Sequence, residues 1–405
     1  MDMTPQPNPL VPNLPAAESI AAAQPAEASA ALPNPLHETH AQADAEFQSY
    51  AAIEVVSTFG EPQAEYAAFR KGCAMCDLPQ RGILELTGRD RLAFLNNLLT
   101  NETWNKSSKS GIAAGKGVYA FFLNLKGRIV ADLNVLETGE RTYLEMDGRY
   151  VESLRATFDK YLFAEQVKMT SRIGQLHQIA LHGPGAAAVL DAASGGHVTE
   201  LPPMGSTQVR LFDVEVTVWR DDPCGVPGLH LIFPTAEARQ IWTSFVNRFG
   251  QLVEHGRRPV RPAGWAAFNA CRIEAARPLF GIDFDDSILP AETGPATFER
   301  AVSVTKGCYL GQEIVARMHA RKQVARQWVG LKVEDGSLPL AGAQLFDDTV
   351  NVIGGITSST VSPILSNAAI CMGYLKKPFF AEGTSVQVPA EGSLRRATVV
   401  KTPFL

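Results

Sequence analysis

The sequence has no lysine or arginine before Arg70, no dense group of cysteines and no long apolar run. A secretory signal peptide needs a basic start, and a mitochondrial transit peptide is rich in arginine, so we expect neither leader. The six cysteines are scattered, which is unlike a secreted disulfide scaffold and indicates a reducing compartment. No apolar run approaches the roughly 20 residues that span a bilayer. These absences predict a cytoplasmic protein that does not cross a membrane.

The first 45 residues differ in composition from the rest of the chain. They are rich in Ala, Pro, Asn and Gln and carry few large apolar groups, which predicts a disordered tail over residues 1–45. Residues 1–69 hold nine acidic side chains, leaving 37 basic against 33 acidic side chains in the remainder. This mildly basic remainder falls short of a nucleic-acid-binding domain but allows a local positive pocket for an anionic ligand.

The length of 405 residues, with 45% hydrophobic and 20% charged residues, predicts a globular protein of two or three domains. Alternating patterns predict strands over 82–86, 117–123, 129–136, 142–146 and 214–219, interleaved with helices over 89–99, 149–161 and 236–249. From about residue 328, short strands with Gly and Pro turns predict a small barrel or sandwich. We therefore expect an α+β fold with antiparallel strands.

The stretch Lys306-Gly307-Cys308-Tyr309-Leu310-Gly311-Gln312-Glu313 combines an ammonium, a thiol, two glycines, an amide and a carboxylate. The glycines permit close backbone approach or positive φ, and the pattern from Glu313 predicts a helix start, which attracts anions. Near that start and Lys306, the Cys308 thiol should be more acidic than free cysteine, hence a better nucleophile, metal ligand or oxidation target. The alternative is a buried, inert cysteine in a tight turn.

These eight residues resemble the K-G-C-Y-x-G-Q-E signature of the YgfZ family, folate-binding proteins of iron–sulfur cluster assembly and repair. The related aminomethyltransferases, the glycine-cleavage T-proteins, keep the lysine-glycine start and the later glycine but lack the cysteine. The resemblance extends from about Gln48 to Leu405 and includes segments at 81–101, 122–129, 272–283 and 354–363.

The resemblance implies an α+β, three-domain, T-protein-like ring. Its folate-binding region, two interleaved domains, would span residues 46–325, and a small C-terminal β-barrel would span residues 326–405. The implied cofactor is tetrahydrofolate or a one-carbon derivative. The implied signature site comprises Lys306, Gly307, Cys308, Tyr309, Gly311, Gln312 and Glu313. The implied folate pocket includes Arg272, Glu274, Asp283 and Asp132.

Cys308 is the residue that we expect to carry the function. One cysteine cannot hold an iron–sulfur cluster alone, so its thiolate would be a transient iron ligand or would trap a reactive species. The implied partners are iron–sulfur assembly proteins or client cluster enzymes, including those that modify tRNA, and no stably bound metal is expected. The Cys73-Ala74-Met75-Cys76 pair has no second C-x-x-C, which leaves a metal or redox site and two buried thiols both open.

The chain departs from the T-protein pattern at two places. Where aminomethyltransferases carry two aspartates after a Gly-Gly turn, Ala131 replaces the first and Asp132 remains. Val226 and His230 stand where that family presents acidic residues to the pterin, and neutral groups cannot make the same charge-assisted hydrogen bonds. Both losses favour an accessory folate-binding factor over aminomethyl transfer. Asp132 could equally be a strand residue that faces solvent.

Two other functions stay open. A folate-dependent aminomethyl or methyl transferase would use Asp132 or Glu274 and would not need Cys308, whereas an interaction scaffold would need neither folate nor cysteine. Arg272 and Glu274, two apart on an expected strand, could be only a buried ion pair. The basic run Arg317, His319, Arg321, Lys322 and Arg326 predicts a docking patch or a solvated helix face. No aromatics interleave this run before Trp328, which disfavours direct RNA binding.

Overall fold

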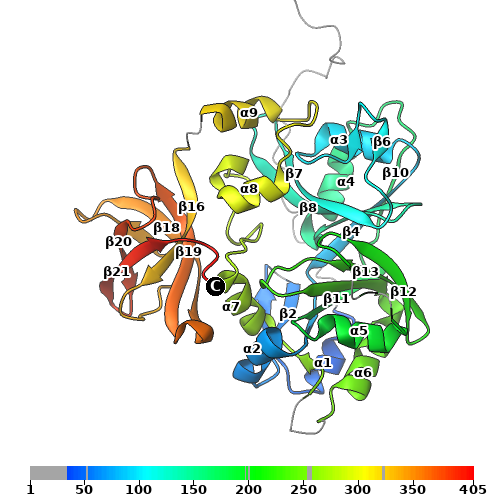
Figure 1. Ribbon diagram of the computed structural model, residues 1–405, viewed down its shortest axis with the longest axis horizontal. Coiled ribbons are helices and arrows are strands. Elements are labelled where there is room, and N and C mark those ends of the chain that lie inside the picture. Colours follow the sequence, from blue (N-terminus) through cyan, green and yellow to red (C-terminus); the bar gives the residue numbers. More distant parts are fainter. Residues whose placement is uncertain (1–33, 52, 197, 199–200, 253–257, 322–323) are drawn as a thin grey trace, which may run out of the picture.

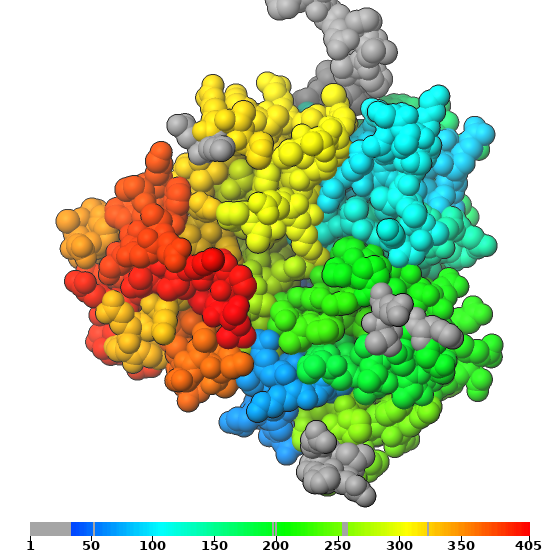
Figure 2. Space-filling model, viewed as in Figure 1, coloured from blue at the N-terminus to red at the C-terminus, as the bar shows by residue number. Residues whose placement is uncertain are grey.

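The computed structural model describes residues 34–405 apart from 52, 197, 199–200, 253–257 and 322–323. The chain forms three lobes, each built on its own sheet, with helix α7 (Trp265–Glu274) between the second sheet and the C-terminal barrel (Figure 1). In the space-filling view the lobes make one continuous body (Figure 2). None of the helices in the described part of the chain is long and apolar enough to cross a membrane.

The first lobe is a five-stranded antiparallel sheet with helices on its outer face. Its strand order is β10 (Lys168–Ser171), β4 (Arg81–Thr87), β9 (Thr142–Asp147), β8 (Ile129–Glu137) and β7 (Lys116–Leu123). Helices α3 (Arg91–Leu98) and α4 (Val151–Asp159) bury Phe94, Leu154 and Phe158 in one core with the sheet. The strands and helices that the sequence predicts between residues 82 and 161 are confirmed.

The second lobe is a six-stranded sheet with the order β12 (Ser206–Leu211), β13 (Val214–Arg220), β14 (Gly228–Pro234), β11 (Leu176–His182), β3 (Ala74–Asp77) and β15 (Arg261–Pro262). Its core includes residues of α5 (Ala186–Ser194) and α6 (Ala238–Phe249). Strand β3 precedes β4 in the chain but belongs to this second sheet, so the two lobes are interleaved in sequence.

The inner faces of the two sheets pack against each other. Ile83 of β4, Leu136 of β8 and Tyr143 of β9 form one apolar cluster with Trp219 of β13 and Ile232 of β14. Each sheet therefore has helices on its outer face and the other sheet on its inner face. Polar side chains of these inner faces, together with Trp219 of the apolar cluster, line the central cavity described below.

The C-terminal lobe is a closed six-stranded barrel, which confirms the expected α+β fold with a small C-terminal barrel. Its strand order is β16 (Arg326–Val333), β19 (Ala368–Lys376), β18 (Val352–Ser362), β17 (Gln344–Phe346), β20 (Ser385–Ala390) and β21 (Ser393–Val400). Trp328, Ile370 and Met372 of the barrel pack on Ile273 of α7. Four further elements are β5 (Trp104–Asn105), β6 (Ser110–Gly111), α8 (Pro295–Ala301) and α9 (Gln312–Arg321).

The N-terminal segment corrects the expected tail. Residues 34–45 include a short helix, α1 (His37–Ala41), and Leu36 is buried in the core of the second lobe. Asn34 Nδ2 and His40 Nε2 contact Asp77 Oδ2 at 2.7 and 2.9 Å. A tail through residue 45 is therefore wrong for residues 34–45, and residues 1–33 lie outside the described residues. The hairpin β1 (Glu46–Tyr50) and β2 (Ile53–Thr58) follows, then α2 (Pro62–Lys71).

Arg272 and Glu274 lie on helix α7 and not on a strand, so their expected pairing on one strand face is wrong. Residues two apart on a helix do not face each other. Arg272 instead donates to Asp283 Oδ2 at 2.6 Å and to the Ser358 hydroxyl of the barrel at 2.7 Å. Glu274 pairs with Arg70 of α2. The Glu274–Arg70 ion pair joins α7 to α2, and the Arg272–Ser358 hydrogen bond joins α7 to the barrel.

Candidate functional site

A central cavity of about 90 Å³ lies between the inner faces of the two sheets. Its walls include Asp132 and Asn134 of β8 and, from the second sheet, Trp219 of β13 and His230 of β14. Arg300, near the end of α8, also lines it. The volume exceeds the roughly 10–15 Å³ that one water molecule needs, so the cavity can receive part of a ligand.

Asp132 faces this cavity because side chains alternate along strand β8. Its neighbour Ala131 points the other way, into the apolar core of the first lobe. The expectation that Asp132 faces solvent is therefore wrong. The loss of an aspartate at position 131 also removes no carboxylate from the cavity, so it is no argument against transfer chemistry.

The environment of Asp132 suits proton exchange. The Tyr119 hydroxyl donates to Asp132 Oδ2 at 3.0 Å. Burial raises the pKa of Asp132, with Arg81 and the Tyr119 hydrogen bond acting in the opposite direction. A carboxyl whose pKa is raised towards neutrality can take up and release a proton more readily near pH 7 than an ordinary aspartate.

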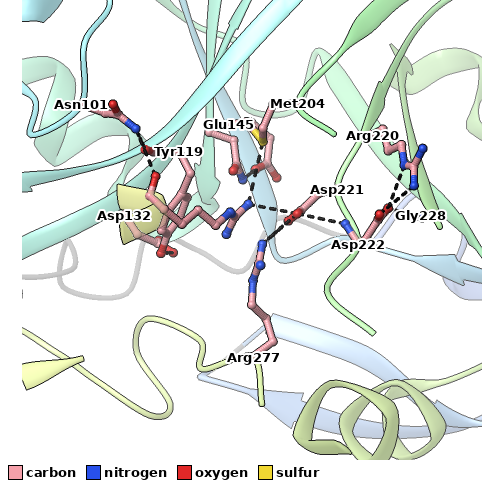
Figure 3. Close-up of polar contacts among 12 residues, drawn as sticks. Asn101, Tyr119, Asp132, Glu145, Met204, Arg220, Asp221, Asp222, Gly228 and Arg277 are labelled. Atoms are coloured by element: carbon pink, nitrogen blue, oxygen red, sulfur yellow. Dashed lines mark hydrogen bonds and ion pairs between the residues drawn. The ribbon is translucent and has the colours of Figure 1, made fainter. Parts of the chain in front are cut away.

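An ion-pair cluster lies beside Asp132 in the same cavity. Asp221 accepts hydrogen bonds from Arg277 at 2.7 and 2.9 Å (Figure 3) and from Arg300 at 3.0 Å. Burial alone would raise the pKa of Asp221, but Arg277 and Arg300 hold it well below its ordinary value. The Arg300 guanidinium also lies 4.0 Å from the centre of the Tyr119 ring. Arg277, Arg300 and Asp221 together carry one net positive charge, which can balance the negative charge of ionised Asp132.

The second sheet supplies polar side chains without partners. His182, Trp219 and His230 are buried, and no described residue makes a hydrogen bond to their ring nitrogens. Burial lowers the pKa of His182 to about 3 and also lowers the pKa of His230, so both rings are neutral near pH 7. Buried polar groups are normally paired, so a buried water molecule or a ligand would have to supply the partners of these nitrogens.

Lys306 anchors the signature loop instead of activating the thiol. Its Nζ donates to the backbone oxygens of Asn96, Leu99 and Asn101 at 2.7, 2.6 and 2.9 Å, around the C-terminal end of α3. These bonds use all three of its donors. Burial lowers the pKa of Lys306 to about 7. The ammonium therefore caps α3, a role that the sequence did not suggest.

Cys308 is exposed, whereas the other five cysteines are buried, so the alternative of a buried Cys308 is wrong. Leu310 N donates to Asn97 O at 3.2 Å, which fastens the loop on the far side of Cys308. Gly311 has φ +79°, and a Cβ there would lie 2.7 Å from Asn124 O, as the expected close approach requires. Helix α9 begins at Gln312, one residue before the expected start.

The predicted site residues thus fall into separate places. Asp132 lines the central cavity, whereas the structure places none of the signature residues in its wall, nor Arg272, Glu274 or Asp283. Tyr309 is buried in the core of the first lobe. Sequence reasoning missed several cavity residues: Tyr119, Asn134, His182, Trp219, Asp221 and Arg300. Arg277 lies in the segment 272–283 that the resemblance placed at the central pocket, and Asn134 had a usable signal in its spacing of two from Asp132 on a predicted strand.

The Cys73 and Cys76 pair is buried in the structure. Burial raises the pKa of Cys73 to about 12 and raises that of Cys76, which disfavours their thiolates. Within the described ranges, no three His, Cys, Asp or Glu side chains are grouped so as to hold a metal ion. The structure therefore supports the interpretation of these two residues as buried thiols.

Two known protein families match this chain, one over the two interleaved lobes and one over the barrel. Residues 36–306 match the family described as GCVT N-terminal domain, and residues 326–405 match the glycine cleavage T-protein C-terminal barrel domain. The chain belongs to the glycine cleavage T-protein family. The T-protein fold accounts for both interleaved sheets and for the closed barrel, whose strands span residues 326–400 of the second match.

Individual relatives of this T-protein chain are named as transferases. A probable aminomethyltransferase of Halobacterium salinarum is 27% identical over 385 residues, covering 92% of this chain and 98% of the relative. An aminomethyltransferase of Geobacillus kaustophilus is 27% identical over 372 residues, covering 91% and 97%. The crystal structure of the glycine cleavage system aminomethyltransferase T from Bartonella henselae matches with a TM-score of 0.80 and 25% identity, covering 92% and 97%.

Proposed function

We propose that this chain binds a reduced folate in the central cavity and catalyses folate-dependent aminomethyl or methyl transfer, with Asp132 as the proton-exchanging group. One observation carries the proposal: a half-buried carboxyl with a raised pKa faces a cavity that polar and charged side chains line. Membership of the T-protein family and the names of the relatives support it. The accessory role favoured by the sequence becomes the second candidate.

The residues around Asp132 have separable roles in this proposal. A bound reduced folate would supply a nitrogen that accepts the one-carbon unit. Asp132 would hold or take up the proton exchanged there, and the Tyr119 hydroxyl orients its carboxylate from 3.0 Å. Arg300, stacked on Tyr119, stabilises the ionised form of Asp132 through its charge.

The test of this proposal is Asp132→Asn, which keeps the size of the side chain and removes its charge and acidity. We expect one-carbon transfer from an aminomethyl donor to tetrahydrofolate to fall about 10²- to 10⁴-fold, the usual loss for a general acid–base group. Tetrahydrofolate affinity should change much less. The matched control is Glu215→Gln, an exposed carboxylate on β13. Full transfer activity in Asp132→Asn would overturn the assignment.

The second candidate is an accessory factor in iron–sulfur cluster assembly or repair, including clusters of tRNA-modifying enzymes. The observation that favours it is the exposed Cys308 thiol, presented by a loop that Lys306 and Leu310 fasten to α3 and the turn after it. A thiolate held outward in a fixed loop could ligate iron together with thiolates of a partner protein. Both candidates begin with folate binding in the same cavity.

Complementation of a strain deficient in folate-dependent cluster maintenance separates the two candidates. Wild type, Cys308→Ala and Asp132→Asn are compared for the activity of a cluster enzyme, after checks of folding and folate binding. If Cys308→Ala fails while Asp132→Asn complements, the accessory role replaces the transfer role. If Cys308→Ala complements fully, the accessory role through this thiol is excluded. If every variant complements and none binds folate, the chain is a scaffold.

A further inference from the structure

We infer that Asn101 and Lys306 are positioning residues that link the signature loop to Asp132 in the central cavity. The described wall of that cavity contains no signature residue, so any effect of the loop on Asp132 has to pass through other residues. The link runs from the loop to the turn that follows α3, from this turn to β7 and α8, and from these two elements to the carboxyl. The inference rests on the proposed proton exchange at Asp132 and adds which residues hold that group in place.

The turn formed by residues 99–101 joins three parts of the chain. Two of its backbone oxygens accept from Lys306 Nζ at 2.6 and 2.9 Å. Thr100, which is fully buried, exchanges two hydrogen bonds with the backbone of Phe121 on β7, at 3.0 and 2.8 Å. Its hydroxyl also donates to Ala301 O, at the end of α8, at 2.7 Å. The turn is therefore held against the signature loop, β7 and α8 at once.

The side chain of Asn101 extends this fixed turn towards the cavity. Its Nδ2 donates to the backbone oxygen of Tyr119 at 2.9 Å (Figure 3) and to that of Arg300 at 3.1 Å. Its Oδ1 accepts from the backbone N–H of Glu102 at 2.9 Å. Carbonyl oxygens only accept and a backbone N–H only donates, so these partners determine the orientation of the amide and use both of its donors. One side chain therefore fixes the backbone of a residue on β7 and of a residue on α8.

Tyr119 and Arg300 carry this position to Asp132. The Tyr119 hydroxyl donates to Asp132 Oδ2 at 3.0 Å, and the Arg300 guanidinium lies 4.0 Å from the centre of the Tyr119 ring. Burial and the charge of Asp132 raise the pKa of Tyr119, so its hydroxyl keeps the proton that it donates. The rigid ring moves with its backbone, and a hydrogen bond weakens steeply once its geometry is lost. Without the bonds from Asn101, this donor should be held less closely against Asp132.

A weaker bond from Tyr119 changes the proton affinity of Asp132 in one direction. Burial, the largest influence, raises the pKa of Asp132, whereas that bond lowers it. The other charged groups that act on Asp132 are Arg81 of β4, Glu145 and Asp147 of β9, and Arg300 of α8. The two carboxylates raise the pKa of Asp132 and the two guanidinium groups lower it. Loosening Tyr119 and Arg300 weakens two lowering influences and leaves the raising ones, so the pKa of Asp132 should rise.

Aspartate labelled with carbon-13 at Cγ reports the protonation of Asp132 by NMR in protein without folate. The Asp132 signal is the one that Asp132→Asn lacks. We expect the midpoint of its titration to lie at higher pH in Asn101→Ala than in wild type. The matched control is Asn247→Ala, at an exposed asparagine on α6, in which the midpoint should not move.

Lys306→Met tests the part of the link that begins in the signature loop. It removes the bond to Asn101 O together with a positive charge, and the midpoint of the Asp132 titration should again move to higher pH. The control is Lys106→Met. Lys106 is exposed, and its Nζ would lie 3.7 Å from a Cβ at Gly307, so its ammonium stands beside the same loop. Lys106→Met removes an equal charge without breaking a bond to Asn101 and should leave the midpoint where it is in wild type.

Transfer activity gives a second readout. Asn101→Ala should lower one-carbon transfer to tetrahydrofolate about tenfold, the equivalent of one hydrogen bond, with tetrahydrofolate affinity within about threefold of wild type. In a Tyr119→Phe background the same substitution should cost less, because the hydroxyl that Asn101 positions is already absent. An equal loss in both backgrounds would exclude the path through Tyr119.

The outcomes separate this inference from the function on which it rests. A midpoint that does not move in Asn101→Ala, or a shift in Lys306→Met no larger than in Lys106→Met, overturns the inference, while loss of transfer in Asp132→Asn leaves the proposed function standing. If Asp132→Asn keeps full transfer activity, the proposed function fails, and the titration of Asp132 still decides the link. Should Asn101→Ala not fold, the comparison of Lys306→Met with Lys106→Met decides it.

Discussion

Asp283 provides the sharpest test of whether the ion pairs around α7 hold the fold together or bind the ligand. The carboxylate is 2% exposed and accepts from Arg272 at 2.6 Å and from the backbone N–H of Leu279 at 2.9 Å. The hydroxyls of Thr357 and Ser358 on the barrel donate to its other oxygen, each at 2.7 Å. Asp283→Ala removes the acceptor of all four bonds and leaves the buried Arg272 guanidinium without its counter-charge.

The expected loss of stability in Asp283→Ala follows from the burial of this ion pair. Removing one partner of a buried ion pair costs about 3–5 kcal/mol, because the other charge stays uncompensated in a poorly solvated place. The matched control is Asp213→Ala. Asp213 pairs with Arg210 at 3.7 Å, with side chains 93% and 67% exposed, and such surface pairs contribute less than about 1 kcal/mol. The two substitutions are chemically identical, but Asp213 has φ +68°, a conformation that alanine adopts less readily than aspartate. The loss in Asp213→Ala is therefore an upper bound on the contribution of the exposed pair, and the difference between the two variants is a lower bound on the effect of burial.

Urea unfolding followed by tryptophan fluorescence and far-UV circular dichroism measures both free energies of unfolding. Folic acid binding is then measured for the variants without urea. We expect Asp283→Ala to lower the free energy of unfolding by about 3–5 kcal/mol. Its folic acid affinity, where it is folded, should stay within about threefold of wild type, a change well under 1.4 kcal/mol, because Asp283 does not line the cavity. A stability loss no larger than that of Asp213→Ala, or lost folate binding at unchanged stability, would refute this reasoning.

Two further predictions concern the signature loop. In native wild-type protein one thiol should react rapidly with Ellman's reagent, because the other five cysteines are buried, and native Cys308→Ala should show no rapidly reacting thiol. In urea, all six thiols of the wild type should react. Two or more rapidly reacting thiols in the native wild type would contradict the structure. Burial lowers the pKa of Lys306 to about 7 from its ordinary 10.5, so between these values the unfolded chain binds more protons than the native one. The free energy of unfolding of the wild type should therefore rise with pH in that window, by at most about 1.4 kcal/mol per pH unit more than that of Lys306→Met. Equal slopes of the free energy of unfolding against pH in the two proteins would exclude Lys306 as the cause.

Local pattern in the sequence predicts the elements that build the cavity. The alternation over 129–136 predicts β8, and the pattern over 214–219 predicts β13, because strands and helices follow the spacing of apolar side chains. The motif at 306–313 predicts a tight turn followed by a helix, as seen in Gly311 and α9. The C-terminal run of short strands with Gly and Pro turns predicts a small barrel or sandwich, and the structure has the barrel. These features depend on neighbours in the chain, and the sequence determines them by itself.

Tertiary structure alone decided which of these residues share a site. Alternation on β8 divides Ala131 from Asp132, but only the packing of the second sheet shows that the face of Asp132 borders a cavity. Likewise, the sequence places Lys306 two residues from Cys308, yet its ammonium is bound by carbonyl oxygens some 200 positions earlier in the chain. Buried charges and polar groups seek whatever partners the fold brings within hydrogen-bonding distance, and sequence separation does not encode that distance.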